Sequence, residues 1–145
     1  MTLLELIIAC AILLILSSAA LPIAKYTVMR QKEAELRRDL REMKDAIDRY
    51  KDAADRNQIR VEIGSEGYPP DLETLVKGVQ LGASSDRKIR FLRKIPVDPM
   101  TGQADWGLRA VQDDPDSTSW GGKNVFDVYS KSTGTALDGT KYSDW

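Results

Sequence analysis

Hydrophobic and polar positions divide the chain into an apolar stretch, an amphipathic stretch and a mixed remainder. Residues 6–24, LIIACAILLILSSAALPIA, carry no charge, and the only charged side chain before Lys25 is Glu5. At 1.5 Å per residue these 19 residues make a helix of roughly 28 Å, close to the thickness of a bilayer core. Residues 1–24 are therefore predicted to form a hydrophobic transmembrane helix.

The helical pattern continues beyond Lys25 with a change of character. Charged residues surround an apolar stripe whose members are three or four positions apart: Leu36, Leu40, Met43, Ile47, Tyr50 and Ala54. Acids precede bases by four residues in three pairs: Glu33 with Arg37, Asp45 with Arg49, and Asp52 with Arg56. Residues 25–60 are predicted to continue the first helix, which would run from Thr2 to about Arg56. The stripe would pack on the rest of the chain, and a coiled coil is the alternative.

The remaining residues, 61–145, predict a small globular domain. Asp71 can cap a short helix, DLETLVKG, that Gly78 ends, and IPVDPMTG (95–102) must turn because two prolines restrict it. Residues 105–111 and 124–131 are expected to form strands, and a third short strand could follow near the C-terminus. In the second strand Phe126, Val128 and Ser130 alternate with Asp127, Tyr129 and Lys131, as expected of a sheet that lies on the helix. The expected fold class is α+β: a long N-terminal α-helix with a protruding hydrophobic half, packed against a small C-terminal antiparallel sheet.

Composition narrows the possible chemistry. The 145 residues carry a formal net charge of −1, and this overall charge does not suggest a nucleic-acid partner, which would need a concentrated basic face. There is no His and only one Cys, which excludes a Cys-His nucleophile, a disulfide framework and the usual zinc sites. Cys10 is interpreted as a small packing residue. No nucleophile–base pair can be named, so we do not expect an enzyme.

Glu5 is the residue that needs an explanation. A charged acid in a membrane helix costs about 2.5–3.5 kcal/mol on insertion scales and usually has a partner. One interpretation places its carboxylate at the membrane interface, among headgroups. The other is an ion pair with another subunit; because no Lys or Arg precedes Lys25, the nearest cation would be an α-amino group.

The first 22 residues, MTLLELIIACAILLILSSAALP, resemble the N-terminal signature of type IV pilins and pseudopilins. The resemblance implies the pilin fold, cleavage of a short leader by a prepilin peptidase and N-methylation of Met1. Met1, Thr2 and Glu5 match the family's assembly residues, with Glu5 neutralising the N-terminus of a neighbouring subunit. Pro22, which cannot donate to the Ser18 carbonyl, is expected to kink or melt the helix.

Later motifs are similar to the soluble domain of major pseudopilins of type II secretion systems. They occur in the same order: YPPDLETLV, IPVDPMTG, WGLRAV, VFDVYSKSTGTALDG and SDW. The implied function is a structural subunit of a pseudopilus, a helical homopolymer that drives protein export. The alternative within the superfamily is the major subunit of a type IV pilus for adhesion, motility or DNA uptake. From another class, the alternative is a monomeric signal-anchored binding module.

The resemblance also implies partners and a location. An assembly ATPase and a platform protein would act on a subunit held in the bacterial inner membrane, with its globular domain in the periplasm. The assembled filament would lie in the periplasm or outside the cell.

Calcium is the one cofactor that the resemblance raises. Pseudopilins often bind it in the last loop, where Asp138 and Asp144 are the candidate ligands. The interpretation that we favour is an ordinary turn at Asp138–Gly139 and a surface charge at Asp144. Asp113, Asp114 and Asp116 are likewise interpreted as a solvated loop.

Overall fold

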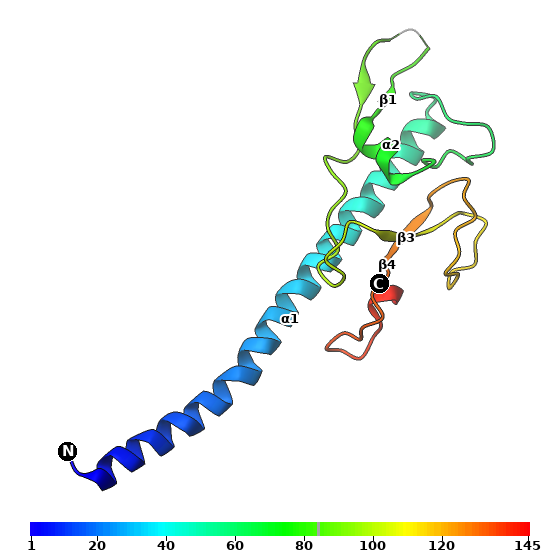
Figure 1. The fold of residues 1–145 in the computed structure, drawn as a ribbon. Coiled ribbons are helices and arrows are strands. Elements are labelled where there is room, and N and C mark those ends of the chain that lie inside the picture. Colours follow the sequence, from blue (N-terminus) through cyan, green and yellow to red (C-terminus); the bar gives the residue numbers. More distant parts are fainter. Residues whose placement is uncertain (84) are drawn as a thin grey trace.

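One long helix organises the fold, and short elements gather along its second half (Figure 1). The computed structural model describes residues 1–83 and 85–145. Helix α1 runs from Leu3 to Asp55, and the chain leaves it through Asn57, which has a positive φ of 55°. The predicted helix from Thr2 to about Arg56 is confirmed. The predicted amphipathic stretch to residue 60 is too long, because the helix ends before this turn.

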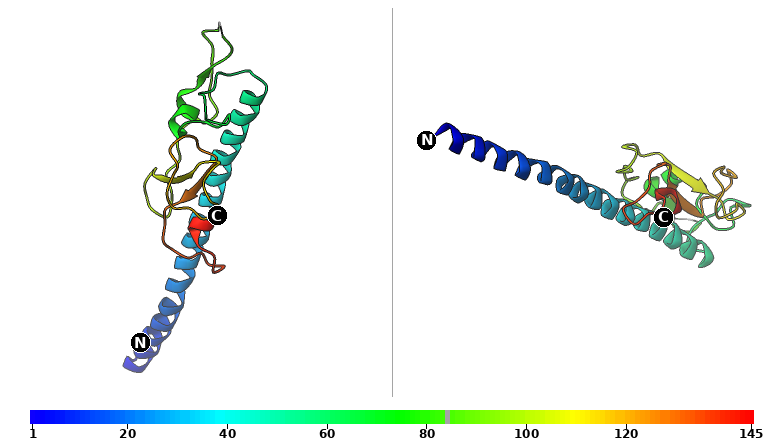
Figure 2. Two further views of the ribbon diagram at one scale, coloured as in Figure 1. Left: turned by 90° about the vertical axis from the view of Figure 1, so that its right-hand side faces the viewer. Right: turned by 90° about the horizontal axis from the view of Figure 1, so that it is seen from below.

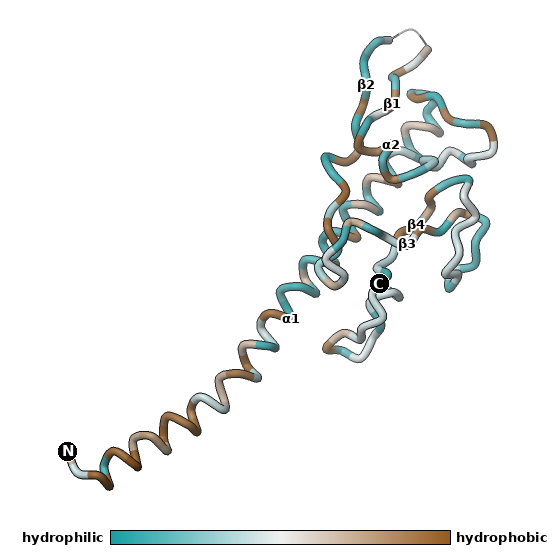
Figure 3. The backbone as a smooth tube through the Cα atoms, in the orientation of Figure 1, coloured by the Kyte–Doolittle hydropathy of each residue, from teal (hydrophilic) through white to brown (hydrophobic). Residues whose placement is uncertain are grey.

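The two halves of α1 differ in their surroundings. Every residue from 1 to 32 is exposed, and the first buried side chain is that of Leu36. Two further views show the first half projecting away from the rest of the chain (Figure 2). The projecting half is also the most hydrophobic part of the backbone trace (Figure 3). The class is α+β, with a protruding apolar half-helix.

The remaining elements are short. They are α2 (Leu72–Lys77), β1 (Val79–Gln80), β2 (Lys88–Ile89), β3 (Trp106–Arg109), β4 (Asp127–Ser130) and the 3-10 helix η1 (Tyr142–Asp144). The sheets are two antiparallel pairs, β1 with β2 and β3 with β4. In the second pair Trp106 lies opposite Ser130, and Arg109 lies opposite Asp127. Asp71 caps α2 through the Thr74 amide, as predicted.

The strands depart from expectation. The predicted ranges 105–111 and 124–131 contain β3 and β4 but are too long, and the β1–β2 hairpin was not predicted. The expected third strand is reduced, within the described residues, to a single bridge between Thr135 and Lys141. Pairings of one or two residues are too short to leave an alternating pattern in the sequence.

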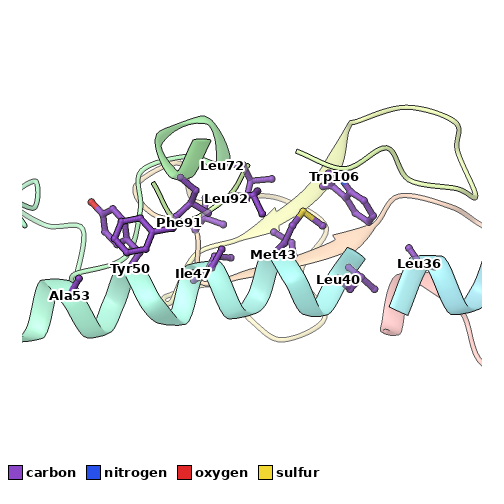
Figure 4. Packing of buried hydrophobic residues seen from close by; sticks show 14 of the residues in the cluster. Leu36, Leu40, Met43, Ile47, Tyr50, Ala53, Leu72, Phe91, Leu92 and Trp106 are labelled. Carbon is purple, nitrogen blue, oxygen red and sulfur yellow. The ribbon is translucent and has the colours of Figure 1, made fainter. Parts of the chain in front are cut away.

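The core lies between the stripe of α1 and the elements laid on it (Figure 4). Leu36, Met43 and Ile47 are fully buried, and Trp106, Phe91 and Leu92 cover them from the other side. The stripe thus packs against other parts of the same chain, as predicted. It does not form the seam of a coiled coil. Ala53 replaces the predicted Ala54 as the last buried member, and Ala54 packs at the edge.

Strand β4 follows its predicted alternation only in part. Val128 and Ser130 are buried, but Phe126, which is in phase with them, is 47% exposed, and Tyr129, which is in the opposite phase, is buried. The Tyr129 ring lies over Gly107, where an added Cβ would come within 2.2 Å of the ring. Arg109 covers the other side of the ring, with its guanidinium carbon 4.0 Å from the ring centroid. Gly107 on one side and Arg109 on the other therefore bury the Tyr129 ring, although Tyr129 lies on the outer face of the sheet.

Candidate functional site

The strongest functional feature is the projecting half of α1, residues 3–24, called here the apolar stalk. Its large hydrophobic side chains are exposed around the whole helix: Leu3, Leu4, Leu6, Ile7, Ile8, Ile12, Leu13, Leu14, Ile15, Leu16, Leu21 and Ile23. A helix that is apolar on all sides has no solvent-facing side and belongs in a membrane or among other helices. By length and composition it is the one helix of the described residues that could cross a membrane.

At the tip of the stalk, Thr2 and Glu5 form a reciprocal cap on α1. The Glu5 amide donates to Thr2 Oγ1 at 3.3 Å, and the Thr2 amide donates to Glu5 Oε2 at 3.5 Å. This capping box satisfies two amides that the helix leaves free. Met1 is 98% exposed beside it. The structure thus brings the three predicted assembly residues together at one end of the molecule.

Pro22 lies within an unbroken helix. Its nitrogen has no hydrogen to donate to the Ser18 carbonyl, yet α1 continues through it and is only gently curved (Figure 1). Two hydroxyls bond backward along the same region, Ser18 Oγ to the Ile15 carbonyl at 2.8 Å and Thr27 Oγ1 to the Ile23 carbonyl at 3.1 Å. Such bonds compete with the helical ladder. In the structure of the single chain the helix is intact at Pro22. Melting of this part of the helix during assembly stays a prediction.

The C-terminal loop is fastened to α1 just beyond the stalk. Glu33 Oε1 accepts hydrogen bonds from the Leu137 amide at 2.8 Å and from the Tyr142 hydroxyl at 2.9 Å. Burial, together with the Glu33 carboxylate, raises the pKa of Tyr142 to about 12. Sequence reasoning missed this junction, although Glu33 lies in phase with the buried stripe, three residues before Leu36.

A second contact of this junction uses one of the predicted calcium residues. Arg37 lies 3.3 Å from Asp138 Oδ2, and its guanidinium carbon lies 4.1 Å from the ring centroid of Trp145. The predicted pair of Glu33 with Arg37 is therefore wrong, because each residue has a partner in the C-terminal loop. Of the other two predicted pairs, Asp52 with Arg56 forms at 3.1 Å, whereas Arg49 bonds to backbone oxygens of Asp45 and Phe91.

The structure gives the Asp138 carboxylate a role in a turn. Oδ1 accepts from the Thr140 hydroxyl at 2.6 Å and from the Thr140 amide at 3.0 Å, and these bonds lower the pKa of Asp138. Gly139 follows with a φ of 86°. Asp144 lies exposed in η1. Among residues 1–83 and 85–145, no three carboxylates or thiols gather in a way that suits a metal ion.

Two other carboxylates hold loops together. Asp113 Oδ2 accepts from the amides of Ala110, at 2.7 Å, and Gly121, at 2.9 Å, and these bonds lower its pKa. Asp98 is fully buried: it accepts from the Met100 amide at 2.8 Å and from the Ser130 hydroxyl. Asp98 thereby ties the turn at 95–102 to β4, a link that sequence reasoning missed.

Comparison with family models, with curated proteins and with solved structures finds no match to this chain.

Proposed function

We propose that this chain is a pilin-like structural subunit that polymerises through its apolar stalk into a helical filament. The observation that carries the proposal is the division of α1. One half is exposed and apolar on every side, and the other half packs under a small domain. A single carboxylate, Glu5, lies near the free end.

The proposed assembly moves the stalk from lipid into a bundle of stalks. Each subunit would leave the inner membrane without exposing its apolar side chains to water, so that helix packing replaces lipid contact. Glu5 would pair with the N-terminal amine of a neighbouring subunit and set the axial register, because an ion pair in a low-dielectric core strongly disfavours other registers. In the isolated chain the same carboxylate accepts from the Thr2 amide, which leaves it exposed at the tip.

The biological form that we propose is a pseudopilus of a type II secretion system. The order of the C-terminal motifs supports this branch over a type IV pilus major subunit. A prepilin peptidase, an assembly ATPase and a platform protein are the proposed partners, and the globular domain is proposed to face the periplasm. We propose no catalytic role and no required cofactor.

The test is electron microscopy of sheared cell fractions together with the intact mass of the N-terminal peptide. Wild type should yield filaments whose N-terminal residue is methylated Met1. Glu5→Ala should abolish them. Unpolymerised protein that retains a leader, in the wild type as well as the variant, would favour a signal-anchored module and overturn the proposal.

Two further variants separate charge from helix capping. Glu5→Gln keeps an acceptor at the third helical position, so that the capping box can still form while the charge is lost. If the charge pairs with an amine, this variant should fail to polymerise as completely as Glu5→Ala. Glu35→Gln removes an exposed carboxylate from the packed half of α1 and should polymerise like the wild type.

A further inference from the structure

Residues 87–94, RKIRFLRK, form a surface that is called here the basic segment. It carries five cations in eight positions: Arg87, Lys88, Arg90, Arg93 and Lys94. All five are exposed, and within residues 1–83 and 85–145 none belongs to an ion pair. Since the whole chain has a net charge of −1, the rest of the molecule is acidic. The basic segment is thus a concentration of positive charge without an ion-pair partner in the part of the chain that the structure describes.

Two buried side chains hold the basic segment rigid. Phe91 and Leu92 are 6% and 3% exposed, and both of their amides donate to the Leu75 carbonyl at 3.0 Å. Arg49 of α1 donates to the Phe91 carbonyl at 2.8 Å. The cations are therefore presented from a fixed backbone, which lowers the entropic cost of binding an anionic partner.

A groove of about 340 Å³ opens beside this backbone. Three arginines line it, Arg49, Arg90 and Arg93, against a single carboxylate, Glu42. Guanidinium groups bind carboxylates in a planar, two-point geometry. The groove fits a short protein loop that presents carboxylates.

The acidic loop, residues 113–116, has the complementary chemistry. Asp113 is held by the amides of Ala110 and Gly121, and this leaves Asp114 and Asp116 exposed on either side of Pro115, neither of them in an ion pair in the described chain. The loop after β3 lies to the right of α1 in Figure 1, and the chain after β2 lies to its left. No ion pair joins the two surfaces within the described residues.

We infer that the basic segment of one subunit docks the acidic loop of a second copy of this chain. Opposite charges on opposite flanks give a head-to-tail contact, which repeats from copy to copy and generates a ring or a helix. The inference rests on the proposed filament and deepens it: the stalks would supply the apolar core, and this charged contact would join neighbouring globular domains. Charge complementarity of this kind fixes register and partner choice more than it adds affinity.

The first test is cysteine cross-linking of the full-length chain in membranes and in filaments. A Cys10→Ser background with Val97→Cys and Pro115→Cys places one thiol beside each surface, both at exposed positions. A head-to-tail contact predicts a ladder of multimers on a non-reducing gel, whereas each single-cysteine variant stops at a dimer or a monomer. The ladder should weaken as ionic strength rises from about 0.05 to 0.5 M, because exposed charges are screened.

The second test reverses the charges. Arg90→Glu with Arg93→Glu should reduce the ladder on the order of tenfold, as should Asp114→Arg with Asp116→Arg, since like charges then face each other. Combining all four substitutions should restore it. Arg60→Glu with Lys141→Glu changes net charge as much as the first variant but lies outside the groove, and should match the wild type.

The outcomes separate this inference from the proposed function. Filaments without a ladder, and without an effect of charge reversal, would overturn the inference and leave polymerisation intact. A ladder in membranes without filaments would support the contact and count against the filament. The inference would also be overturned if the ladder is lost in both double variants and the fourfold variant does not restore it. Direct pairing between the two surfaces requires that restoration.

Discussion

The two halves of α1 belong to one continuous helix but differ in what covers them. In the second half, a stripe such as Leu36, Met43 and Ile47 is buried by strands and loops of the same chain, and the remaining faces carry charges. In the stalk every face is apolar and none is covered. The difference teaches that one unbroken helix can cross from one environment to another, because the side chains of each half determine what that half contacts.

The largest expected effect is on the stability of the domain, and it appears when the same substitution, Ile→Ala, is made in each half of α1. Ile47→Ala should destabilise the domain by about 2–5 kcal/mol, because Ile47 is fully buried and its loss leaves a cavity. Ile12→Ala, in the stalk at 52% exposure, should change the same quantity by less than about 0.5 kcal/mol. Denaturant unfolding of the detergent-solubilised chain, followed by tryptophan fluorescence, measures both. If both variants lowered the free energy of unfolding equally, the stalk and the domain would unfold together. The two halves of α1 would then not be energetically separate.

This contrast could largely be foreseen from local pattern. The apolar run and the stripe lie within a few residues of the structure they specify, and α1 was predicted to within one residue at each end. The cap of α2 by Asp71 and the turn at Asp138–Gly139 are equally local. Helix periodicity and side-chain caps act over one or two turns, which is why sequence alone suffices for them.

What could not be foreseen depends on residues far apart. Glu33 finds Tyr142 over 109 positions, and Asp98 finds Ser130 over 32. The β1–β2 hairpin has only two pairs of partners, too few to leave a pattern. The basic segment is visible in the sequence, but only the fold shows that its cations have no ion-pair partner among the described residues and that the acidic loop lies on the other side of α1.

A smaller effect is expected at the junction of the two halves. Tyr142→Phe removes the hydrogen bond to the Glu33 carboxylate and should cost about 1–3 kcal/mol at neutral pH. The variant should also change the dependence of stability on pH. Since the pKa of Tyr142 is raised to about 12 in the folded chain, against about 10 when unfolded, the folded state holds its proton more tightly.

The sign follows from proton binding. Between about pH 10 and 12 the unfolded chain releases the Tyr142 proton while the folded chain keeps it, so this residue's contribution to stability, complete below pH 10, is lost as the pH rises. Melting temperatures from pH 8 upward should therefore fall less steeply in Tyr142→Phe than in wild type. Tyr26→Phe, in the exposed part of α1, is the matched control and should keep the wild-type profile. If the melting temperatures of the two variants fell equally with pH, the raised pKa of Tyr142 would be contradicted.

The smallest expected effect is that of calcium on this junction. Asp138 already uses Oδ1 for Thr140 and Oδ2 for Arg37, and among the described residues neither Asp138 nor Asp144 belongs to a group of three acidic side chains that could hold a metal ion. A ligand that binds only the folded state raises the melting temperature in proportion to its saturation. Calcium at about 1 mM, which saturates many extracellular sites, should therefore leave the melting temperature unchanged, as should a chelator.

A rise with calcium but not with magnesium, lost in Asp138→Asn and kept in Asp114→Asn, would mean that the loop rearranges to bind the ion. Such a rearrangement would have to release Arg37 from Asp138, because a cation and a guanidinium cannot share one carboxylate oxygen without repulsion. The loop would then keep its hydrogen bonds to Glu33 and the bond from Lys44 Nζ to the Trp145 carbonyl. Calcium would in that case replace one of the contacts that fasten the C-terminal loop to α1, near the place where the buried part of the helix begins.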